Sequence, residues 1–371
     1  MPGPGLRRGD ELERCVALMS GYQLAENVSL QGRNTFRVPA RASMMADVRR
    51  ADALGELFDF AMLRHGPVLV LGEGSNLLFA ADYPGVVICL TMAGITILED
   101  DGAHALVRAD AGVAWNDLVG WTLARGLCGL ENMALIPGTV GAAPIQNIGA
   151  YGAEVGEYIE TVEAFARDTG QLKRVSRADC GFAYRDSVFK REPERWVVTA
   201  IELRLPRQAE LRMDYAGVRE ELAAMGVATP RAPHVAEAIS RIRTRKLPNP
   251  AILGNAGSFF KNPIVAQGVA DALKDAHPAL PVFPGDAIDT RKLSAAWMIE
   301  NAGWKGFREG DAGISAQHAL VLVNHGNASG AELLGLARRV AASVHDKFGV
   351  TLEPEPRIIG ATFVDGTNPA G

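Results

Sequence analysis

The clearest pattern along the chain is an apolar stripe at helical spacing, which recurs in several segments. It first occurs after residue 50, where apolar residues follow the i, i+3, i+4, i+7, i+8 spacing of a helix with one buried face. That face comprises Leu54, Leu57, Phe58, Ala61 and Met62. Gly66-Pro67 ends the helix, and the wholly apolar Val68–Leu71 predicts a buried strand. Residues 22–50, before the helix, have extended character.

Short β-type segments dominate the middle of the chain. We predict strands over residues 78–79, 86–90, 95–98 and 105–109, with a turn at 83–85. A helix over 114–125 follows and is closed by Gly126. Asp168-Thr169-Gly170 predicts a hairpin between strands 161–167 and 171–175, and a further strand over 196–205 ends at Pro206.

Helical spacing returns after residue 207. One helix should end near Leu247-Pro248, because a residue that precedes proline disfavours helical backbone. Its apolar face comprises Val235, Ala238, Ile239 and Ile242. Ser329 and Glu332 have the spacing of a capping box, which begins a helix that stops at Gly349. This last helix should bury Leu333, Ala337, Val340, Val344 and Phe348.

Composition describes an ordinary globular protein of two or three domains, with 371 residues, 48% of them hydrophobic and 22% charged. The net charge of −5 argues against nucleic-acid binding, which normally requires a basic excess on one face. The apolar run after Arg7 and Arg8 is too short for a signal peptide, and no window reaches the ~18 apolar residues of a membrane span. We therefore expect a cytoplasmic protein.

The cysteines and histidines give no sign of a metal site. The histidines lack metal-ligand spacing, and the cysteines form no C-x-x-C pair. We expect no metal, and buried free thiols in a reducing compartment at Cys15, Cys89, Cys128 and Cys180.

The segment LIPGTVGAAPIQNIGAYG, residues 135–152, is rich in glycine and almost free of charge. Glycine lets the backbone take positive φ and approach a ligand closely. A buried set of turns is one interpretation. The length of the run and its lack of charge favour the other, a backbone cradle for a cofactor, with Thr139, Gln146 and Asn147 as its polar side chains.

A second glycine turn, Gly72-Glu73-Gly74-Ser75-Asn76, directly follows the predicted strand Val68–Leu71. It lacks the third glycine and the following helix of a dinucleotide fingerprint, and no G-K-[ST] makes it a P-loop. Two interpretations remain: an anion-binding turn of another kind, and a plain corner between strands.

Three further segments carry candidate chemistry. Ser258 and Lys261 form S-x-x-K, the pattern of some serine acyl enzymes, but the companion motifs S-D-N and K-T-G do not follow. The two adjacent phenylalanines suggest instead a serine in a partly apolar pocket. Arg185 follows Tyr184 in an apolar context that suits it to bind a carboxylate. Glu355 lies between two prolines that fix the local backbone.

Together these segments resemble the UDP-N-acetylenolpyruvoylglucosamine reductase (MurB) family, type I. The matching motifs run in family order between about residues 20 and 362: GEGSN at 72–76, IPGTVGAAPIQNIGAYG at 136–152, YRDSVF at 184–189, GNAGSFFKNP at 254–263 and LEPEPRIIG at 352–360. The resemblance implies an α+β fold, with an FAD-binding domain of the vanillyl-alcohol oxidase type in two lobes and a third, substrate-binding domain. The boundaries expected are an extension over 1–21, lobe 1 over 22–89 with 352–371, lobe 2 over 90–207, and the third domain over 208–351.

The resemblance also implies non-covalently bound FAD, with NADPH as co-substrate. The FAD contacts it implies are Gly72, Glu73, Gly74, Ser75, Asn76, Leu77, Ile136, Pro137, Gly138, Thr139, Gly141, Ala142, Gln146, Asn147, Gly149, Ala150 and Gly152.

The reaction implied is the two-electron reduction of an enolpyruvyl UDP sugar. Arg185 would pair with the substrate carboxylate, Glu355 would stabilise the same group, and Ser258 would protonate the adjacent carbon. The substrate contacts implied are Tyr184, Tyr215, Lys246 and Asn262. The family match raises Lys246 above its basic neighbours Arg241, Arg243 and Arg245, which we interpret as a solvated helix end.

The chain departs from the family pattern at Pro356, where an aliphatic residue is usual, and in its first twenty residues, which have no clear counterpart. Two other function classes remain open: a hydrolase that uses Ser258 and Lys261, and a non-catalytic nucleotide-sugar-binding module. We expect small-molecule partners, a monomer, and no nucleic acid or membrane.

Overall fold

Two compact units make up the computed structural model, which describes residues 21–215 and 217–363. Of the described residues, the first unit comprises 21–28, 42–72, 84–215 and 217–240, and the second comprises 29–41, 73–83 and 241–363. The chain therefore enters the second unit three times. Apart from Gly21, the predicted N-terminal extension lies outside the described residues.

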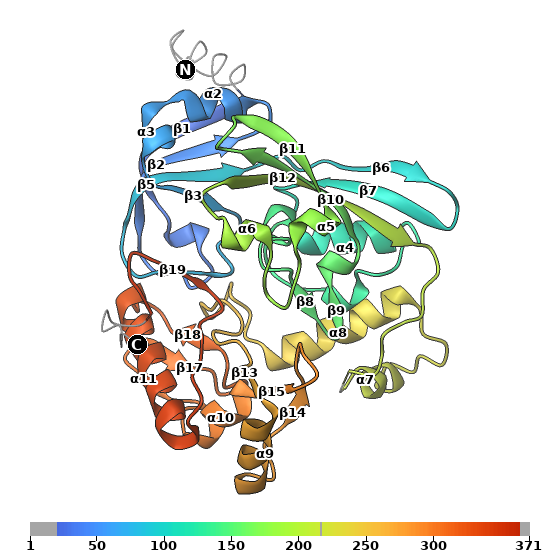
Figure 1. The fold of residues 1–371 in the computed structure, drawn as a ribbon, viewed down its shortest axis with the longest axis vertical. Coiled ribbons are helices and arrows are strands. Elements are labelled where there is room, and N and C mark those ends of the chain that lie inside the picture. Colours follow the sequence, from blue (N-terminus) through green and yellow to red (C-terminus); the bar gives the residue numbers. More distant parts are fainter. Residues whose placement is uncertain (1–20, 216, 364–371) are drawn as a thin grey trace, which may run out of the picture. The chain divides into compact units, whose positions relative to one another are not determined.

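The first unit contains two large sheets (Figure 1). The four-stranded sheet has the order β1-β2-β5-β3, with β3 and β5 parallel, and the five-stranded sheet has the order β11-β10-β12-β7-β6 with antiparallel pairs. The strands are β1 (Tyr22–Ser29), β2 (Arg41–Val48), β3 (Val68–Leu71), β5 (Tyr83–Leu90), β6 (Ile95–Asp100), β7 (His104–Asp110), β10 (Ile159–Ala166), β11 (Gln171–Ser176) and β12 (Trp196–Pro206). Most of them match the predicted strands within a few residues.

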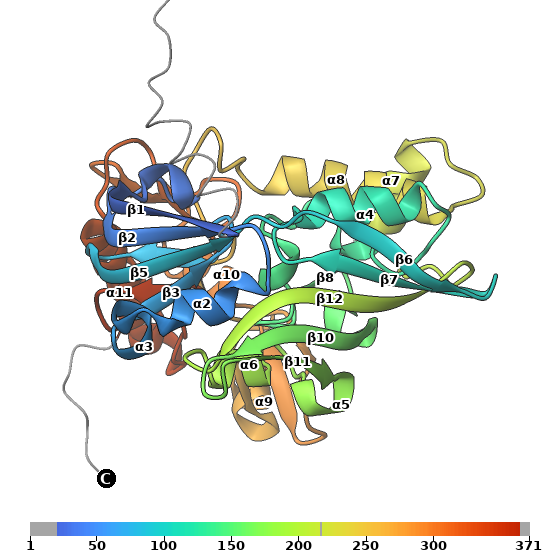
Figure 2. The same cartoon turned by 90° about the horizontal axis from the view of Figure 1, so that it is seen from above.

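Short helices accompany these sheets, and Figure 2 shows α4 and α5 on opposite sides of the long strand β12. The first unit has α2 (Ala53–Asp59), α3 (Ala61–His65), α4 (Trp115–Leu123), α5 (Arg177–Cys180), α6 (Val188–Arg191) and α7 (Val218–Ala224). The 3-10 turns of the described chain are η1 (Gln31–Arg33), η2 (Glu131–Met133), η3 (Val140–Ala142) and η4 (Val155–Glu157), and a small hairpin joins β8 (Gly149–Ala150) to β9 (Ala153–Glu154). Helix α8 (Ala232–Lys246) begins in the first unit and ends in the second.

The predicted helix after residue 50 is split in two, so part of its apolar face was wrongly predicted. Phe60 takes extended backbone (φ −65°, ψ 132°) between α2 and α3. This break rotates the following turn, so that Leu63 is buried while Ala61 and Met62 are exposed. The predicted residues Leu54, Leu57 and Phe58 do enter the core, where the Phe58 ring stacks on Phe165 at 5.2 Å and joins the two sheets.

The turn predicted at residues 83–85 is also wrong, because Tyr83 already begins β5. The chain bends at residues 80–81 instead. Gly85 serves close packing within the sheet, since a Cβ there would lie 2.0 Å from the Pro67 carbonyl oxygen. The amide of the next residue, Val86, donates to that same oxygen at 3.0 Å.

The second unit is built from small sheets and the long helix α11 (Gly330–Phe348). Its sheets are β13-β15-β14, β16-β17-β18 and the parallel pair β19-β4. The bounds are β4 (Leu77–Phe79), β13 (Ile264–Ala266), α9 (Gln267–Ala276), β14 (Val282–Pro284), β15 (Thr290–Leu293), α10 (Ala295–Asn301), β16 (Arg308–Glu309), β17 (Ala312–Ile314), β18 (Leu322–Asn324) and β19 (Arg357–Ile359). The α11 prediction is confirmed in full, from the Ser329–Glu332 capping box to Gly349 in left-handed conformation.

The structure describes three of the four cysteines and shows how long and apolar its helices are. Cys89 and Cys180 are buried, Cys128 is half-buried, and all are free thiols, while Cys15 lies outside the described residues. No helix in residues 21–215 or 217–363 is long and apolar enough to cross a lipid bilayer.

Candidate functional site

The predicted cofactor stretch, residues 135–152, is a series of tight turns fixed to the segment that leads into α4. The amides of Val140 and Gly141 donate to the carbonyls of Val113 and Ala111, each at 2.9 Å. The amide of Trp115 donates to the Gly138 carbonyl, also at 2.9 Å. The stretch is therefore held by backbone pairing with the segment that leads into α4.

Glycine is required in this stretch by close packing. A Cβ on Gly141 would lie 2.6 Å from the Cβ of Ala111. A Cβ on Gly72 would lie 2.6 Å from Thr139 Oγ1, so Gly72, the first residue of the second glycine turn, packs against the first stretch inside the first unit. Gly138 takes a φ of 125°, which a residue with a side chain rarely adopts. This cradle of bare backbone suits a ligand that needs close approach, as FAD does.

The predicted FAD contacts in this stretch have graded exposure. Pro137, Ala142 and Gly152 are exposed, while Gly138 and Asn147 are buried. The half-buried members are Ile136, Thr139, Gly141, Gln146, Gly149 and Ala150.

Strained backbone is concentrated around the cradle. Of the six residues other than glycine that have positive φ in the described chain, four lie in or beside this site. They are Leu135 (60°), Asn147 (47°), Tyr151 (48°) and Arg185 (54°). Such conformations persist only where the surroundings enforce them, and they cluster at functional sites.

Asn147 fixes the cradle from inside. Its amide nitrogen donates to Glu154 Oε2 at 2.7 Å and to the Ala183 carbonyl at 3.1 Å. Its amide oxygen accepts from the Gly156 amide at 2.9 Å. Because these bonds direct the side chain into the protein, we expect the backbone of Asn147, and not its amide group, to face a ligand.

The YRDS segment is attached to the same cradle. The Arg185 guanidinium donates to the Gly149 carbonyl at 2.9 Å and lies 5.2 Å from the centre of the Tyr184 ring. Ser187 Oγ donates to the Ile145 carbonyl at 2.7 Å. The structure thus brings the predicted carboxylate-binding arginine to the predicted flavin-binding stretch, within the first unit.

Tyr215 belongs to this group as well. Its side chain is 56% exposed, and its ring lies edge-on to Tyr151 at 5.2 Å. The preceding segment is held by Arg212, which donates to the Gly152 carbonyl at 2.7 Å and to Glu157 at 2.9 Å. Burial acts to raise the pKa of the Glu157 carboxyl, but its hydrogen bonds from Arg212 and the Glu154 amide prevail, so the pKa is lowered.

Ser258 and Glu355 come together in the second unit. The amide of Glu355 donates to the carbonyl of Phe259 at 2.8 Å, and Phe260 forms an antiparallel bridge with Pro354. The hydroxyl of half-buried Ser258 has no hydrogen-bond partner among the described residues, so it is available to a ligand.

Asn76, at the end of the turn after β3, is hydrogen-bonded to the segment that follows Glu355. The amide of Arg357 donates to the Asn76 carbonyl at 3.0 Å, where β19 begins its parallel pairing with β4. Gly74 takes a φ of 65°, and a Cβ there would lie 2.2 Å from the Arg33 carbonyl oxygen. The predicted contacts Glu73, Ser75 and Leu77 are exposed or half-buried along this turn.

In an S-x-x-K acyl enzyme the lysine acts on the serine, whereas here Lys261 pairs with Glu353. Its ammonium pairs with Glu353 at 2.9 Å, and its amide donates to the Glu353 carbonyl at 3.0 Å. Because its ammonium is engaged by Glu353, Lys261 is not bonded to the Ser258 hydroxyl in this structure, which disfavours the acyl-enzyme interpretation.

The remaining predicted substrate residues also lie in the second unit. Asn262 Oδ1 accepts from the Ala295 amide at 3.0 Å, at the start of α10. Lys246 is exposed at the end of α8. His318 faces this lysine; burial and then the charges of Lys246 and Lys305 lower the pKa of the His318 imidazole.

Pro356 disrupts little in this arrangement. It is buried, and the amides on both sides of it, at Glu355 and Arg357, are already hydrogen-bonded to Phe259 and Asn76. The bonds that hold this segment in the described chain therefore need no donor at residue 356.

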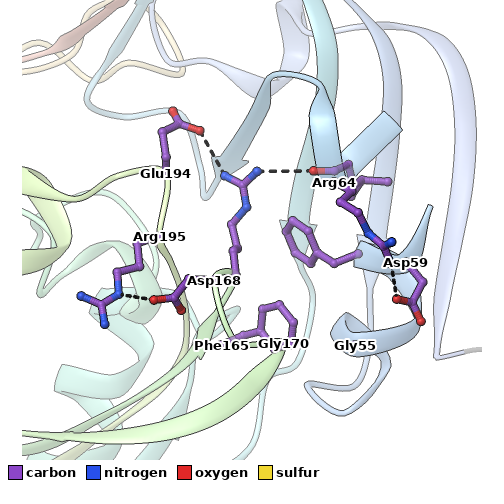
Figure 3. Close-up of a pocket in the computed structure, with 11 residues that line it drawn as sticks. Gly55, Asp59, Arg64, Phe165, Asp168, Gly170, Glu194 and Arg195 are labelled. Atoms are coloured by element: carbon purple, nitrogen blue, oxygen red, sulfur yellow. Dashed lines mark hydrogen bonds and ion pairs between the residues drawn. The ribbon is translucent and has the colours of Figure 1, made fainter. Parts of the chain in front are cut away.

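A separate groove of about 570 Å³ in the first unit is lined by none of the predicted site residues (Figure 3). Phe58 and Phe165 lie in it, and its charged side chains pair with one another. These pairs are Arg64–Asp59 at 2.7 Å, Arg167–Glu194 at 3.1 Å and Arg195–Asp168 at 3.0 Å. We therefore assign the groove no ligand.

Sequence reasoning missed the residues that hold the site in place. Asn116 Oδ1 accepts from the amide of strained Leu135 at 2.8 Å, and Thr35 donates twice to the Gly74 carbonyl. No local signal marks either of them, because their partners are distant in sequence. Ser187 alone could have indicated the cap of α6, because serine is a preferred N-cap residue, and its Oγ accepts from the Lys190 amide.

Comparison with known proteins shows which families of domains the chain resembles. Residues 42–176 match the family model of an FAD binding domain, and residues 249–359 match that of the UDP-N-acetylenolpyruvoylglucosamine reductase C-terminal domain. The predicted α+β fold with an FAD-binding domain is thereby confirmed.

Whole-chain relatives extend the match. UDP-N-acetylenolpyruvoylglucosamine reductase of Xanthomonas euvesicatoria is 54% identical over 93% of this chain and 99% of its own. The Xylella fastidiosa protein of the same name is 52% identical over 92% of this chain and 97% of its own. The crystal structure of the Thermus caldophilus reductase matches with a TM-score of 0.63 and 26% identity, covering 91% of this chain and 99% of that one. The chain therefore belongs to the UDP-N-acetylenolpyruvoylglucosamine reductase family.

Proposed function

We propose that this protein reduces UDP-N-acetylglucosamine enolpyruvate to UDP-N-acetylmuramate, a precursor of peptidoglycan, with NADPH as the source of electrons. The observation that carries the proposal is 54% identity, over 93% of the chain, to a reductase named for this substrate. Bound FAD, held without a covalent bond, supplies hydride transfer from NADPH to the terminal carbon of the enol ether.

The chain's own residues bind the substrate and handle the proton. Arg185 pairs with the substrate carboxylate, which gains negative charge as hydride arrives, and Glu355 stabilises the same group. Ser258 gives its hydroxyl proton to the carbon next to the carboxylate, and water restores that proton afterwards. The atoms then balance: one hydride and one proton convert the double bond to a lactyl group. Tyr184, Tyr215, Lys246 and Asn262 bind the rest of the substrate.

The backbone of the two glycine segments holds the FAD. Gly72 and the turn to Leu77 bind its pyrophosphate, while residues 136–152 surround the pyrophosphate and the flavin ring. Support comes from Gly72, which is exposed, and Gly141, which is half-buried: at each of them a Cβ would lie 2.6 Å from a neighbouring side chain.

For the domain organisation we propose what the family resemblance implies: lobe 1 over 22–89 with 352–371, lobe 2 over 90–207 and a substrate domain over 208–351. We further propose a cytoplasmic monomer that binds no nucleic acid.

One anaerobic experiment on the purified protein tests this function by its visible absorbance. NADPH should bleach the flavin spectrum, and the enolpyruvyl UDP sugar should then restore it. Bleaching without recovery would retain a flavoenzyme but reject this substrate. A protein that cannot be loaded with FAD would instead favour a binding module, and labelling of Ser258 by a serine-directed probe would favour a hydrolase.

A further inference from the structure

Arg185 occupies a backbone position that normally belongs to glycine. Ala183 and Asp186 exchange two backbone hydrogen bonds of 3.1 Å, so Tyr184 and Arg185 form a two-residue turn between them. Arg185 has a φ of 54°, whereas Tyr184 is not among the residues with positive φ. This is the pattern of a type II turn, in which the third residue is usually glycine or asparagine.

Lys190 holds this turn from the neighbouring helix. Its ammonium donates to the carbonyl oxygen of Arg185 at 2.8 Å. That carbonyl belongs to the peptide that follows the strained residue, so the bond restrains the rotation that would return Arg185 to ordinary backbone. Lys190 is half-buried, and a partly desolvated ammonium makes a stronger hydrogen bond than a solvated one.

The base of Lys190 is itself fixed to the glycine stretch. Lys190 lies on α6, whose N-cap residue Ser187 accepts from the Lys190 amide and donates to the Ile145 carbonyl at 2.7 Å. The guanidinium of Arg185 reaches the Gly149 carbonyl of the same stretch at 2.9 Å. The turn is therefore held at its backbone by Lys190 and at its side chain by Gly149.

We propose that Lys190 is the positioning residue of Arg185: its ammonium fixes the left-handed backbone that aims the guanidinium along the glycine stretch. The inference rests on the proposed role of Arg185 as the carboxylate-binding residue. Lys190 itself touches neither substrate nor cofactor in this assignment. Its loss should therefore affect only the steps in which Arg185 takes part.

The test is a double-mutant cycle on the FAD-loaded protein, using single-turnover reoxidation of the reduced flavin by the enolpyruvyl sugar. Lys190→Met should slow reoxidation by roughly tenfold or more, since small misplacements of a positioning group have effects of this size. In Lys190→Met, the rate of flavin reduction by NADPH and the dissociation constant of FAD should stay within about twofold of the wild-type values. Lys190→Arg, which can donate to the same carbonyl, should recover much of the lost rate. Lys173→Met, on β11 of the same unit, is the matched control and should behave like wild type.

The Arg185→Ala background separates this inference from the function on which it rests. There, Lys190→Met should slow reoxidation by less than about twofold further, because the group it positions is absent. Equal slowing in both backgrounds would show a general structural role and overturn the inference, as would a wild-type rate in Lys190→Met. If Arg185→Ala alone leaves reoxidation unchanged, the proposed role of Arg185 fails, whatever Lys190 does.

A second readout does not depend on turnover. Trypsin cleaves after arginine, and the tight turn protects the Arg185–Asp186 bond in the folded, FAD-loaded protein. Lys190→Met should increase cleavage at this bond, measured by mass spectrometry, while cleavage after Arg174 stays unchanged. Equal cleavage of wild type and Lys190→Met at Arg185 would contradict the proposed restraint.

Discussion

The backbone amide of Glu355 donates a hydrogen bond of 2.8 Å to the carbonyl of Phe259, the residue directly after Ser258. This bond ties two predicted catalytic residues together although they lie far apart in the sequence. The position of Ser258 thus depends on the segment directly before β19, where Pro354 forms a β-bridge with Phe260.

Replacement of Ser258 by alanine should separate the two half-reactions. We expect Ser258→Ala to bind FAD and to be bleached by NADPH at the wild-type rate. Reoxidation by the enolpyruvyl sugar should fall by about 10²–10⁴-fold, the usual contribution of a positioned acid. Anaerobic stopped-flow absorbance measures both rates.

The control for this experiment is Ser176→Ala. It removes the hydroxyl that caps α5 but lies outside the proposed site, so it should alter stability and not reoxidation. Wild-type reoxidation in Ser258→Ala would remove this serine from the mechanism.

Loss of the Lys261 ammonium should change neither stability nor turnover by much. The pair with Glu353 is open to solvent, with 28% and 70% of the two side chains exposed. Because exposed pairs contribute little, Lys261→Met should change the free energy of unfolding by at most ~1 kcal/mol. Turnover should be retained. A loss of turnover together with probe labelling of Ser258 that depends on Lys261 would revive the acyl-enzyme interpretation.

The packing at Gly141 predicts a sharp response to a single methyl group. The added Cβ of Gly141→Ala would lie 2.6 Å from Ala111 Cβ and 3.1 Å from Ala111 Cα, so the backbone must shift. We expect a loss of about 1–3 kcal/mol in stability and weaker FAD binding, measured by urea unfolding and flavin fluorescence.

Gly120→Ala provides the matched comparison. Gly120 lies within α4, and nothing surrounds its Cβ position within 4 Å. Alanine should stabilise this helix by up to ~1 kcal/mol and leave FAD binding unchanged. A similar loss of FAD in both variants would show that the cradle geometry is not what binds the cofactor.

His318 should make stability depend on pH. Burial, with Lys246 and Lys305 opposing protonation and Glu300 favouring it, lowers the imidazole pKa in the folded protein. The unfolded chain therefore binds the proton more readily, so His318 lowers the free energy of unfolding as the pH falls below about 6.5. Nδ1 accepts from the Leu320 amide at 3.3 Å, which places the proton of the neutral ring on Nε2.

The measurement is urea unfolding between about pH 7.5 and 5, the range in which a histidine with a lowered pKa acts. His318→Asn should lose less stability than wild type over this range. If both proteins follow the same curve, His318 is not protonated differently in the folded and unfolded states.

Local patterns predicted most elements, because their signals lie within a few residues. The Ser329–Glu332 capping box, the stripe ending at Phe348 and the αL glycine after it specify α11 without reference to the rest of the protein. The break at Phe60 carried no such signal, since neither glycine nor proline lies there. Gly85 suggests a turn by its residue type, whereas in the structure its missing side chain leaves room for the Pro67 carbonyl oxygen.

The site was predicted through its motifs and not through its contacts. Glycines and the family pattern identified the cradle, yet nothing in the sequence indicated that Asn147 turns inward or that Lys190 supports Arg185. Such bonds join side chains to backbone atoms of other segments. Because nearly all residues have the same backbone groups, the sequence does not show which backbone atom a side chain will bind.

The parallel pair β4–β19 joins the Gly72–Asn76 turn to almost the last described residues of the chain. During synthesis that turn emerges long before β19 and stays unpaired until β19 has left the ribosome. A product that stops short of residue 357 would lack β19 and the hydrogen bond from the Arg357 amide to the Asn76 carbonyl. The turn that we propose for the FAD pyrophosphate would then be without its partner strand.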